Sequence, residues 1–276
     1  MRVRQDQARI VPFPRVRQPI IDALRRARKT MSVMHAIVEF DVTGPRAAIR
    51  ELKERTGEPL SLTAFLVACL ARAVDENKAV QAYRKGSRLV IFDDVDVSVM
   101  IERNIDGQGK APISPHVIKA ANNKTIAEIQ AEIVAARSED TSSVAKWTGR
   151  YRYLPAFIRS LLWRMWLGSP YWRKNLTGTV GLSSVGMFGQ GSGWGIPVST
   201  YTLSVLVGGI ADKPGVKDGR ISAREYLSLT ASFDHDVVDG APAARFIGRL
   251  KELVESGYGL GEPAAAPAAQ PPSGRM

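Results

Sequence analysis

The chain has one cysteine, three histidines and no long apolar run among its 276 residues. A single cysteine, Cys69, excludes an internal disulfide and is typical of a reducing, cytoplasmic environment. Its apolar neighbours predict a small buried side chain rather than a nucleophile. No run approaches the ~20 apolar residues that cross a bilayer. The basic N-terminal stretch has no apolar core, so no secretory signal is expected.

Acidic residues are outnumbered. The chain has 38 Lys and Arg against 27 Asp and Glu, a net charge of +11. Such a charge is typical of proteins that bind nucleic acid, but the basic residues are interleaved with acidic ones. No recognition helix, zinc motif or aromatic stacking motif accompanies them. We therefore expect no nucleic-acid partner and no metal. A polyanionic small molecule is the alternative use of this charge.

The periodicity of apolar residues predicts an α+β fold with a mixed sheet. Helices are expected at 20–34, 45–55, 61–77, 125–137 and 241–255. Strand-like runs occupy 36–42, 179–183, 202–210 and 226–233, and residues 88–102 contain two more, on either side of Asp93-Asp94. An extended basic arm (1–16) is expected before the domain at 17–258. The Ala/Pro-rich tail (259–276) is expected to be disordered, because it cannot bury enough apolar surface.

The chemistry is predicted where the last strand-like run meets the last helix. His235 lies there, four residues before the pair Asp239-Gly240. An imidazole has an unperturbed pKa of about 6.5, which suits a general base near neutral pH. His35 and His116 lie in settings typical of surface or packing residues. Gly240 is expected to permit a close backbone approach.

This H-x-x-x-D-G segment resembles the active-site motif of the E2 acyltransferase components of 2-oxo acid dehydrogenase complexes, which chloramphenicol acetyltransferase shares. Residues 180–189 resemble the family's strand and turn, which carry a serine that steadies the oxyanion. Ser183 precedes His235 by 235 − 183 = 52 residues, about where the family places that serine. Its neighbour Ser184 remains an alternative donor. The likeness continues in order from about residue 17 to 256.

The resemblance implies a chloramphenicol acetyltransferase-like mixed sheet flanked by helices, in a trimer (or a multiple of it) with active sites at the subunit interfaces. It implies acyl transfer between coenzyme A and the dihydrolipoyl thiol of a separate lipoylated carrier. His235 would be the base and Ser183 the oxyanion donor, while Asp239 would pair with Arg17 to fix the loop. Two alternatives remain: a coenzyme A-dependent O- or N-acyltransferase acting on a small molecule, and a non-catalytic trimeric assembly protein.

Two departures from the family pattern have consequences for function. Asp236 follows the histidine where those E2 components usually have arginine, so the pKa of the base or the choice of carrier could change. Residues 147–175 read as an insertion with an apolar helical face. It could pack against the body or a neighbouring subunit, cover a hydrophobic acyl chain, or lie on a membrane surface. Packing is the favoured interpretation, and membrane contact is the least favoured.

Overall fold

A β-sheet with helices on its faces forms most of the described chain. The computed structural model describes residues 11, 13, 17–102, 114–138, 154–155, 157–158, 161, 165, 168–185 and 191–261. The helices are α1 (Gln18–Thr30), α2 (Thr43–Thr56), α3 (Leu62–Glu76), α4 (Ile126–Ser138), α7 (Pro170–Thr177) and α8 (Gly240–Glu255), with 3₁₀ turns η2 (Lys78–Gln81) and η3 (Ala121–Asn123). The strands are β1 (Val33–Asp41), β2 (Tyr83–Lys85), β3 (Arg88–Val90), β4 (Val97–Ile101), β5 (Ser114–Ile118), β6 (Val180–Ser184), β7 (Leu203–Lys217) and β8 (Arg220–Asp234).

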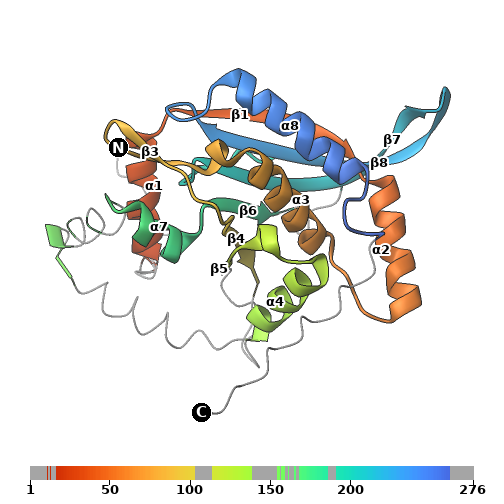
Figure 1. Cartoon of the computed structure of the whole chain (residues 1–276), viewed down its shortest axis with the longest axis horizontal. Coiled ribbons are helices and arrows are strands. Elements are labelled where there is room, and N and C mark those ends of the chain that lie inside the picture. The colour runs from red at the N-terminus through yellow and green to blue at the C-terminus, as the bar shows by residue number, and fades with distance from the viewer. Residues whose placement is uncertain are drawn as a thin grey trace, which may run out of the picture.

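The main sheet has the strand order β1-β8-β7-β6-β4-β5. Strand β6 runs parallel to both β4 and β7, and the other pairings are antiparallel. The sheet is therefore mixed, which confirms the expected α+β class. Strands β2 and β3 form a separate hairpin. Beyond the end of β1, β7 and β8 continue as a two-stranded hairpin that projects from the body (Figure 1).

One face of the sheet carries the apolar core. Alternate residues of each strand point toward α3, α4 and α8 because side chains in a strand alternate between faces. Phe233 of β8, for example, meets Phe246 of α8 edge to face, with ring centroids 5.8 Å apart. Helix α3 is buried along most of its length. Its first turn is capped by Ser61, whose Oγ accepts the Ala64 N–H at 3.1 Å, as the sequence predicts.

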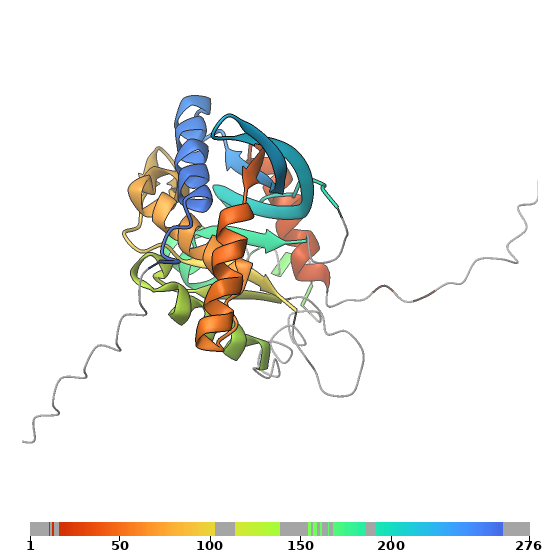
Figure 2. The ribbon, with the colours of Figure 1, turned by 90° about the vertical axis from the view of Figure 1, so that its right-hand side faces the viewer.

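The opposite face is polar, and the segment 191–202 runs across part of it. We call this segment the strap. Figure 2 shows α8 on one side of the sheet and α1 on the other. On the strap side, β8 presents three side chains that are fully buried although polar: Ser228, Thr230 and Ser232. The strap is held by hydrogen bonds from Trp194 Nε1 to the Val38 carbonyl (3.0 Å) and from the Gly209 N–H to the Gly193 carbonyl (3.2 Å).

Several predicted boundaries need correction. Helix α1 ends at Thr30 and β1 begins at Val33, whereas the sequence predicts a helix as far as residue 34. Strand β5 was not predicted, because its five residues include Pro115; an edge strand tolerates a proline. Helix α7 lies within the predicted insertion. The rest of 147–175, most of the arm 1–16, and the tail from 262 onward lie largely or wholly outside the described residues.

Candidate active site

His235 begins the short loop between β8 and α8, residues 235–239, which we call the histidine loop. Its backbone N–H donates to the Ser32 carbonyl at 2.7 Å. The Ser32 N–H in turn donates to Asp234 Oδ1 at 3.2 Å. Because Ser32 directly precedes β1, these two bonds tie the start of the loop to the edge strand of the sheet. The sequence placed His235 at this strand-to-helix junction, but nothing in it pointed to Ser32.

The imidazole of His235 is accessible, with 52% of its side chain exposed. Its Nδ1 lies 3.9 Å from Asp239 Oδ1, and the Asp239 side chain is 82% exposed. This distance is too long for a hydrogen bond, so the carboxylate acts on the ring only through its charge. The loop therefore presents an accessible imidazole with a carboxylate nearby.

Asp234 supports the loop from below. Its side chain accepts the N–H groups of Ser32 and of Asp236, the latter at 3.3 Å. Burial raises the pKa of this carboxyl above its ordinary value, although the two backbone bonds act in the opposite direction. The carboxylate is thus a structural acceptor that the fold keeps at an electrostatic cost.

Asp236, the departure from the family pattern, forms an ion pair with Arg84 of β2 at 2.9 Å. Both side chains are partly exposed. The carboxylate therefore has a cationic partner from the β2–β3 hairpin. Sequence reasoning identified Asp236 but missed Arg84, which lies far away in the chain.

Ser183 and Ser184 point to opposite faces of β6. Ser184 lies on the helix side, where it lines a cavity of about 660 Å³ together with Arg46 and Thr63. Ser183 pairs with Leu206 of β7 on the strap side and is partly exposed. Ser183 is hydrogen-bonded to no other described side chain. Its hydroxyl is therefore available to a ligand on the polar face.

A single chain does not bring Ser183 and His235 together. Ser183 is level with Leu206, and Leu206 with Thr230, two strands away on β8. Asp234 lies four residues farther along β8. With about 3.3 Å per residue and about 4.8 Å between strands, the Cα positions of Ser183 and Asp234 are roughly 16 Å apart, and His235 is one residue farther along the chain. A hydroxyl that stabilises an oxyanion must approach to about 2.7–3.1 Å.

Two of the predicted supporting contacts are not formed. Arg17 is the N-cap of α1, and no ion pair joins it to Asp239 among the described residues; Asp239 lies beside His235 instead. Gly240 is the first residue of α8, and a Cβ there would meet no atom within 4 Å. The expectation that a side chain would obstruct the turn at Gly240 is therefore wrong for the isolated chain.

The cysteine and the other two histidines are buried or contact neighbouring side chains. Cys69 is fully buried, and burial raises the pKa of its thiol, so the expected inert role is confirmed. His35 Nδ1 lies 2.8 Å from Ser232 Oγ, and His116 Nε2 lies 3.2 Å from Glu132. The described residues contain no cluster of side chains suited to a metal ion. Within the same residues, no helix combines the length and apolar character needed to traverse a bilayer.

A cavity of about 420 Å³ opens beside the histidine loop. Its wall includes Asp234 and Asp236 of the loop region and the guanidinium groups of Arg26, Arg84 and Arg173. These arginines come from α1, β2 and α7, so only the folded chain assembles them. Sequence reasoning assigned none of them to the site, because basic residues spread along a chain carry no positional signal.

Comparison with known proteins identifies a family and several relatives. The family model of the 2-oxoacid dehydrogenases acyltransferase (catalytic domain) matches residues 5–143 and 174–260. The lipoamide acyltransferase component of the branched-chain alpha-keto acid dehydrogenase complex of Bacillus subtilis is 25% identical over 251 residues, covering 89% of this chain and 52% of that protein. A dihydrolipoyllysine-residue succinyltransferase component from Arabidopsis thaliana is 23% identical, covering 91% and 48%. The chain thus spans about half the length of the curated relatives it matches.

Solved structures share the fold. A probable dihydrolipoamide acetyltransferase from Listeria monocytogenes superposes with a TM-score of 0.68 at 22% identity, covering 91% of this chain and 96% of that one. The dihydrolipoamide acetyltransferase of Azotobacter vinelandii gives 0.67 at 22% identity, covering 91% and 93%. In that enzyme, the catalytic roles of a serine, a histidine 52 residues later and an asparagine four residues after the histidine have been investigated.

Proposed function

Because this chain belongs to the 2-oxoacid dehydrogenase acyltransferase (catalytic domain) family, we propose that it transfers an acyl group between coenzyme A and a dihydrolipoyl thiol. The observation that carries the proposal is the accessible imidazole of His235, whose backbone is anchored to Ser32 and whose ring lies near the Asp239 carboxylate. The spacing of Ser183, His235 and Asp239 equals that of the serine, histidine and asparagine investigated in the Azotobacter enzyme.

In the proposed mechanism, His235 Nε2 removes the proton of the attacking thiol. A thiol of pKa about 8.5 is mostly protonated at neutral pH, and only its thiolate attacks. Transfer to an imidazole of pKa about 6.5 is uphill by roughly 2.7 kcal/mol. General-base catalysis can offset this cost, since it commonly accelerates a reaction about 10²–10⁴-fold.

The thiolate then adds to the thioester carbonyl and forms a tetrahedral oxyanion. We assign stabilisation of this oxyanion to the hydroxyl of Ser183, a contribution of roughly 3–4 kcal/mol. When the intermediate collapses, the carbon–sulfur bond of the original thioester breaks. The departing thiolate recovers the proton from the His235 imidazolium, so the enzyme returns to its starting state without an acyl-enzyme.

Ser183 and His235 can serve one reaction only if two subunits share the site. The separation of roughly 16 Å between Ser183 and Asp234, the residue before His235, supports an arrangement in which the histidine loop of one subunit faces β6 of the next. Head-to-tail contacts of this kind can close into a ring, and we propose that the ring is a trimer or a multiple of it, as the family resemblance implies. The atomic structure of the cubic core of a pyruvate dehydrogenase multienzyme complex, with 21% identity and a TM-score of 0.67, has the same protomer fold.

The proposed carrier of the dihydrolipoyl group is a separate lipoylated protein. The names of the relatives, lipoamide acyltransferase and dihydrolipoyllysine-residue succinyltransferase components, support a lipoyl acceptor. A hydroxyl or amine of a small molecule would use the same base and the same oxyanion donor. Assaying a lipoylated domain beside free small acceptors separates these two substrate classes.

The decisive experiment compares the wild-type protein with His235→Ala. The variant should lose at least about 10²-fold in acyl transfer between acyl-coenzyme A and dihydrolipoamide. It should keep its affinity for coenzyme A, which equilibrium titration measures. Asp239→Asn serves as a graded control, because it removes the carboxylate charge near the ring but leaves the base in place. Near-normal turnover by His235→Ala would refute the assignment of the base.

A further inference from the structure

The cavity beside the histidine loop is walled by α7, a helix from the segment that the sequence marks as inserted. Arg173 and Thr177 of α7 face the cavity, together with Arg26 of α1 and Arg84 of β2. The family model matches residues up to 143 and resumes at 174, so Arg173 lies outside the matched part. The chain therefore places an arginine of its own on the wall of this cavity, together with Asp234 and Asp236, the two residues that flank His235; His235 itself does not line the cavity.

Arg173 is held in a fixed position. Its guanidinium lies over the ring of Tyr83, 4.1 Å from the centroid, and Nη2 donates to the Thr200 carbonyl. Tyr83 is itself buried, and its hydroxyl donates to the Gly178 carbonyl at 2.5 Å. Stacking on an aromatic face and a backbone bond leave other N–H donors of the planar guanidinium available.

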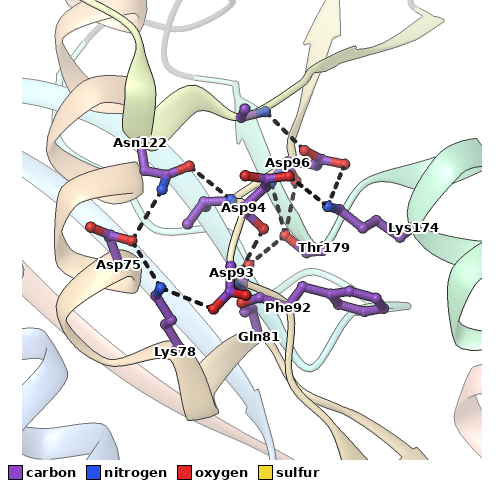
Figure 3. A network of polar contacts seen from close by, with 12 residues as sticks. Asp75, Lys78, Gln81, Phe92, Asp93, Asp94, Asp96, Asn122, Lys174 and Thr179 are labelled. Carbon is purple, nitrogen blue, oxygen red and sulfur yellow. Dashed lines mark hydrogen bonds and ion pairs between the residues drawn. The ribbon is translucent and has the colours of Figure 1, made fainter.

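Helix α7 is anchored next to Arg173 by a polar network (Figure 3). Lys174 lies 3.4 Å from a carboxylate oxygen of Asp94 and 3.7 Å from one of Asp96. Asp96 is buried and also accepts the Ala120 N–H at 2.9 Å. The backbone around Asp96 is joined to Thr179, whose hydroxyl donates to Gln81. The adjacent Arg173 is therefore presented by a rigid support.

The charges around the cavity are unequally satisfied. Asp236 is paired with Arg84, and Asp234 accepts the backbone N–H groups of Ser32 and Asp236. The charge of Arg173 also lowers the pKa of Asp234, against the larger opposite effect of burial. Among the ion pairs of the described residues, none includes Arg26 or Arg173. Two guanidinium groups thus border the cavity without a carboxylate partner, next to the hydroxyl-bearing Thr177. The same wall carries Ala23, Ala27, Met31 and Val237, so the two arginines are its sites for an anion.

We propose that this cavity binds an oxyanion of the acyl donor through Arg173 and Arg26. The oxyanion is either a phosphate of coenzyme A or a carboxylate at the far end of the acyl group. Both present the oxygen atoms that a guanidinium recognises. The inference rests on the proposed function. For helix α7, this inference assigns Arg173 a role in binding an anion and not in covering a hydrophobic acyl chain.

The test measures equilibrium binding by calorimetry, without turnover, for the wild-type protein and three variants. Arg173→Leu removes the fixed guanidinium, and Arg26→Leu removes the exposed one, which can be lost without disturbing the fold. Arg137→Leu changes the net charge equally but lies on α4, away from the cavity. The probes are succinyl-coenzyme A against butyryl-coenzyme A, and coenzyme A against 3′-dephospho-coenzyme A.

Arg173→Leu should weaken binding of the anionic probe by about 10- to 100-fold, the loss typical of one hydrogen bond to a charged group. Arg26→Leu should weaken it by roughly 2- to 5-fold, because solvent screens the exposed side chain. Arg137→Leu should bind like the wild type. A loss confined to succinyl-coenzyme A identifies the carboxylate, and a loss shared by every probe except dephospho-coenzyme A identifies the 3′-phosphate.

Equal affinity of Arg173→Leu, Arg26→Leu and the wild type for all four probes would overturn the subsite. The proposed function would still stand in that case, provided that acyl transfer persists and depends on His235. If the wild-type protein binds none of the probes, both the subsite and the proposed function are wrong. The binding and transfer assays thus distinguish the two failures.

Discussion

Arg84 and Asp236 join the β2–β3 hairpin to the histidine loop, through an Nη1–Oδ2 contact of 2.9 Å one residue after the proposed base. The hairpin is a separate two-stranded unit, so this ion pair is a direct connection from it to the loop. Residue 236 was expected to influence either the base or the choice of carrier. The structure adds that its charge is balanced within the same chain.

Breaking this pair should slow transfer without unfolding the protein. Arg84→Ala and Asp236→Ala should each lower kcat/KM by at most about fivefold, since partly exposed pairs contribute up to ~1 kcal/mol. The exchanged pair Arg84→Asp with Asp236→Arg should recover most of the loss. A double-mutant cycle at low and high salt measures the coupling. Strictly additive single losses would show that the contact does not position the loop.

The two neighbouring serines can be separated kinetically. Ser183→Ala should lower kcat by roughly 10²–10³ with little change in coenzyme A affinity, the cost of one oxyanion donor. Ser184→Ala is the matched control, because its side chain lies on the helix side of β6. Steady-state rates with acyl-coenzyme A and dihydrolipoamide measure both variants. A slow Ser184→Ala beside a normal Ser183→Ala would reverse the assignment.

The sequence predicted the elements whose apolar periodicity is strong. Helices α3 and α8 begin and end within one residue of the expected positions. Short elements carry too few residues for periodicity to be detected, so β5 and α7 were missed. The strands β7 and β8 are longer than expected because their projecting ends are polar and lack the alternation of a half-buried strand.

The predicted site was limited in another way. His235, Ser183 and Asp239 were located from the spacing of a motif, through the resemblance to a known family. Arg84 and Arg173 reach the histidine loop through the pairing of distant elements, and no local pattern encodes such a contact. Counting along the chain selected Arg17 as the partner of Asp239. Among the described residues no ion pair joins these two, and the turn after β8 places Asp239 near His235.

The raised pKa of Asp234 should make the stability of the fold decrease as pH rises, which is unusual for an aspartate. Its pKa in the folded chain is raised, chiefly by burial, above the ordinary value of 3.8. The folded state therefore binds the proton more tightly than the unfolded state, and this group destabilises the fold as pH rises through the folded pKa. Asp234→Asn keeps an oxygen acceptor for Ser32 but carries no charge. It should raise Tm at pH 7 relative to the wild type, and the gain should shrink as pH falls toward 3.8.

Thermal unfolding of both proteins across pH 4–8 checks this sign. Activity should be followed in parallel, because the substitution adjoins His235. A gain in Tm that is largest at acid pH, or absent at pH 7, would contradict the burial argument for Asp234.

Two adjacent glycines of β7 allow the strap to lie on the sheet. The pairing of β7 with β8 shifts between Val207 and Ile210, at an irregularity that contains Gly208 and Gly209. A Cβ on Gly208 would lie 2.0 Å from the Gly193 carbonyl oxygen, and one on Gly209 would lie 1.9 Å from that of Gly191. Neither contact is possible without moving the strap backbone.

Gly208→Ala and Gly209→Ala should therefore each lower the free energy of unfolding by about 1–3 kcal/mol, the usual cost of overpacking. Gly248→Ala is the matched control: it lies within α8, a Cβ there meets no atom within 4 Å, and it should stabilise by about 0.5–1 kcal/mol. Urea unfolding measures all three. Since the strap follows the strand that carries Ser183, the two β7 variants should also lose transfer activity. Full stability of Gly208→Ala would mean that the strap does not rest on β7.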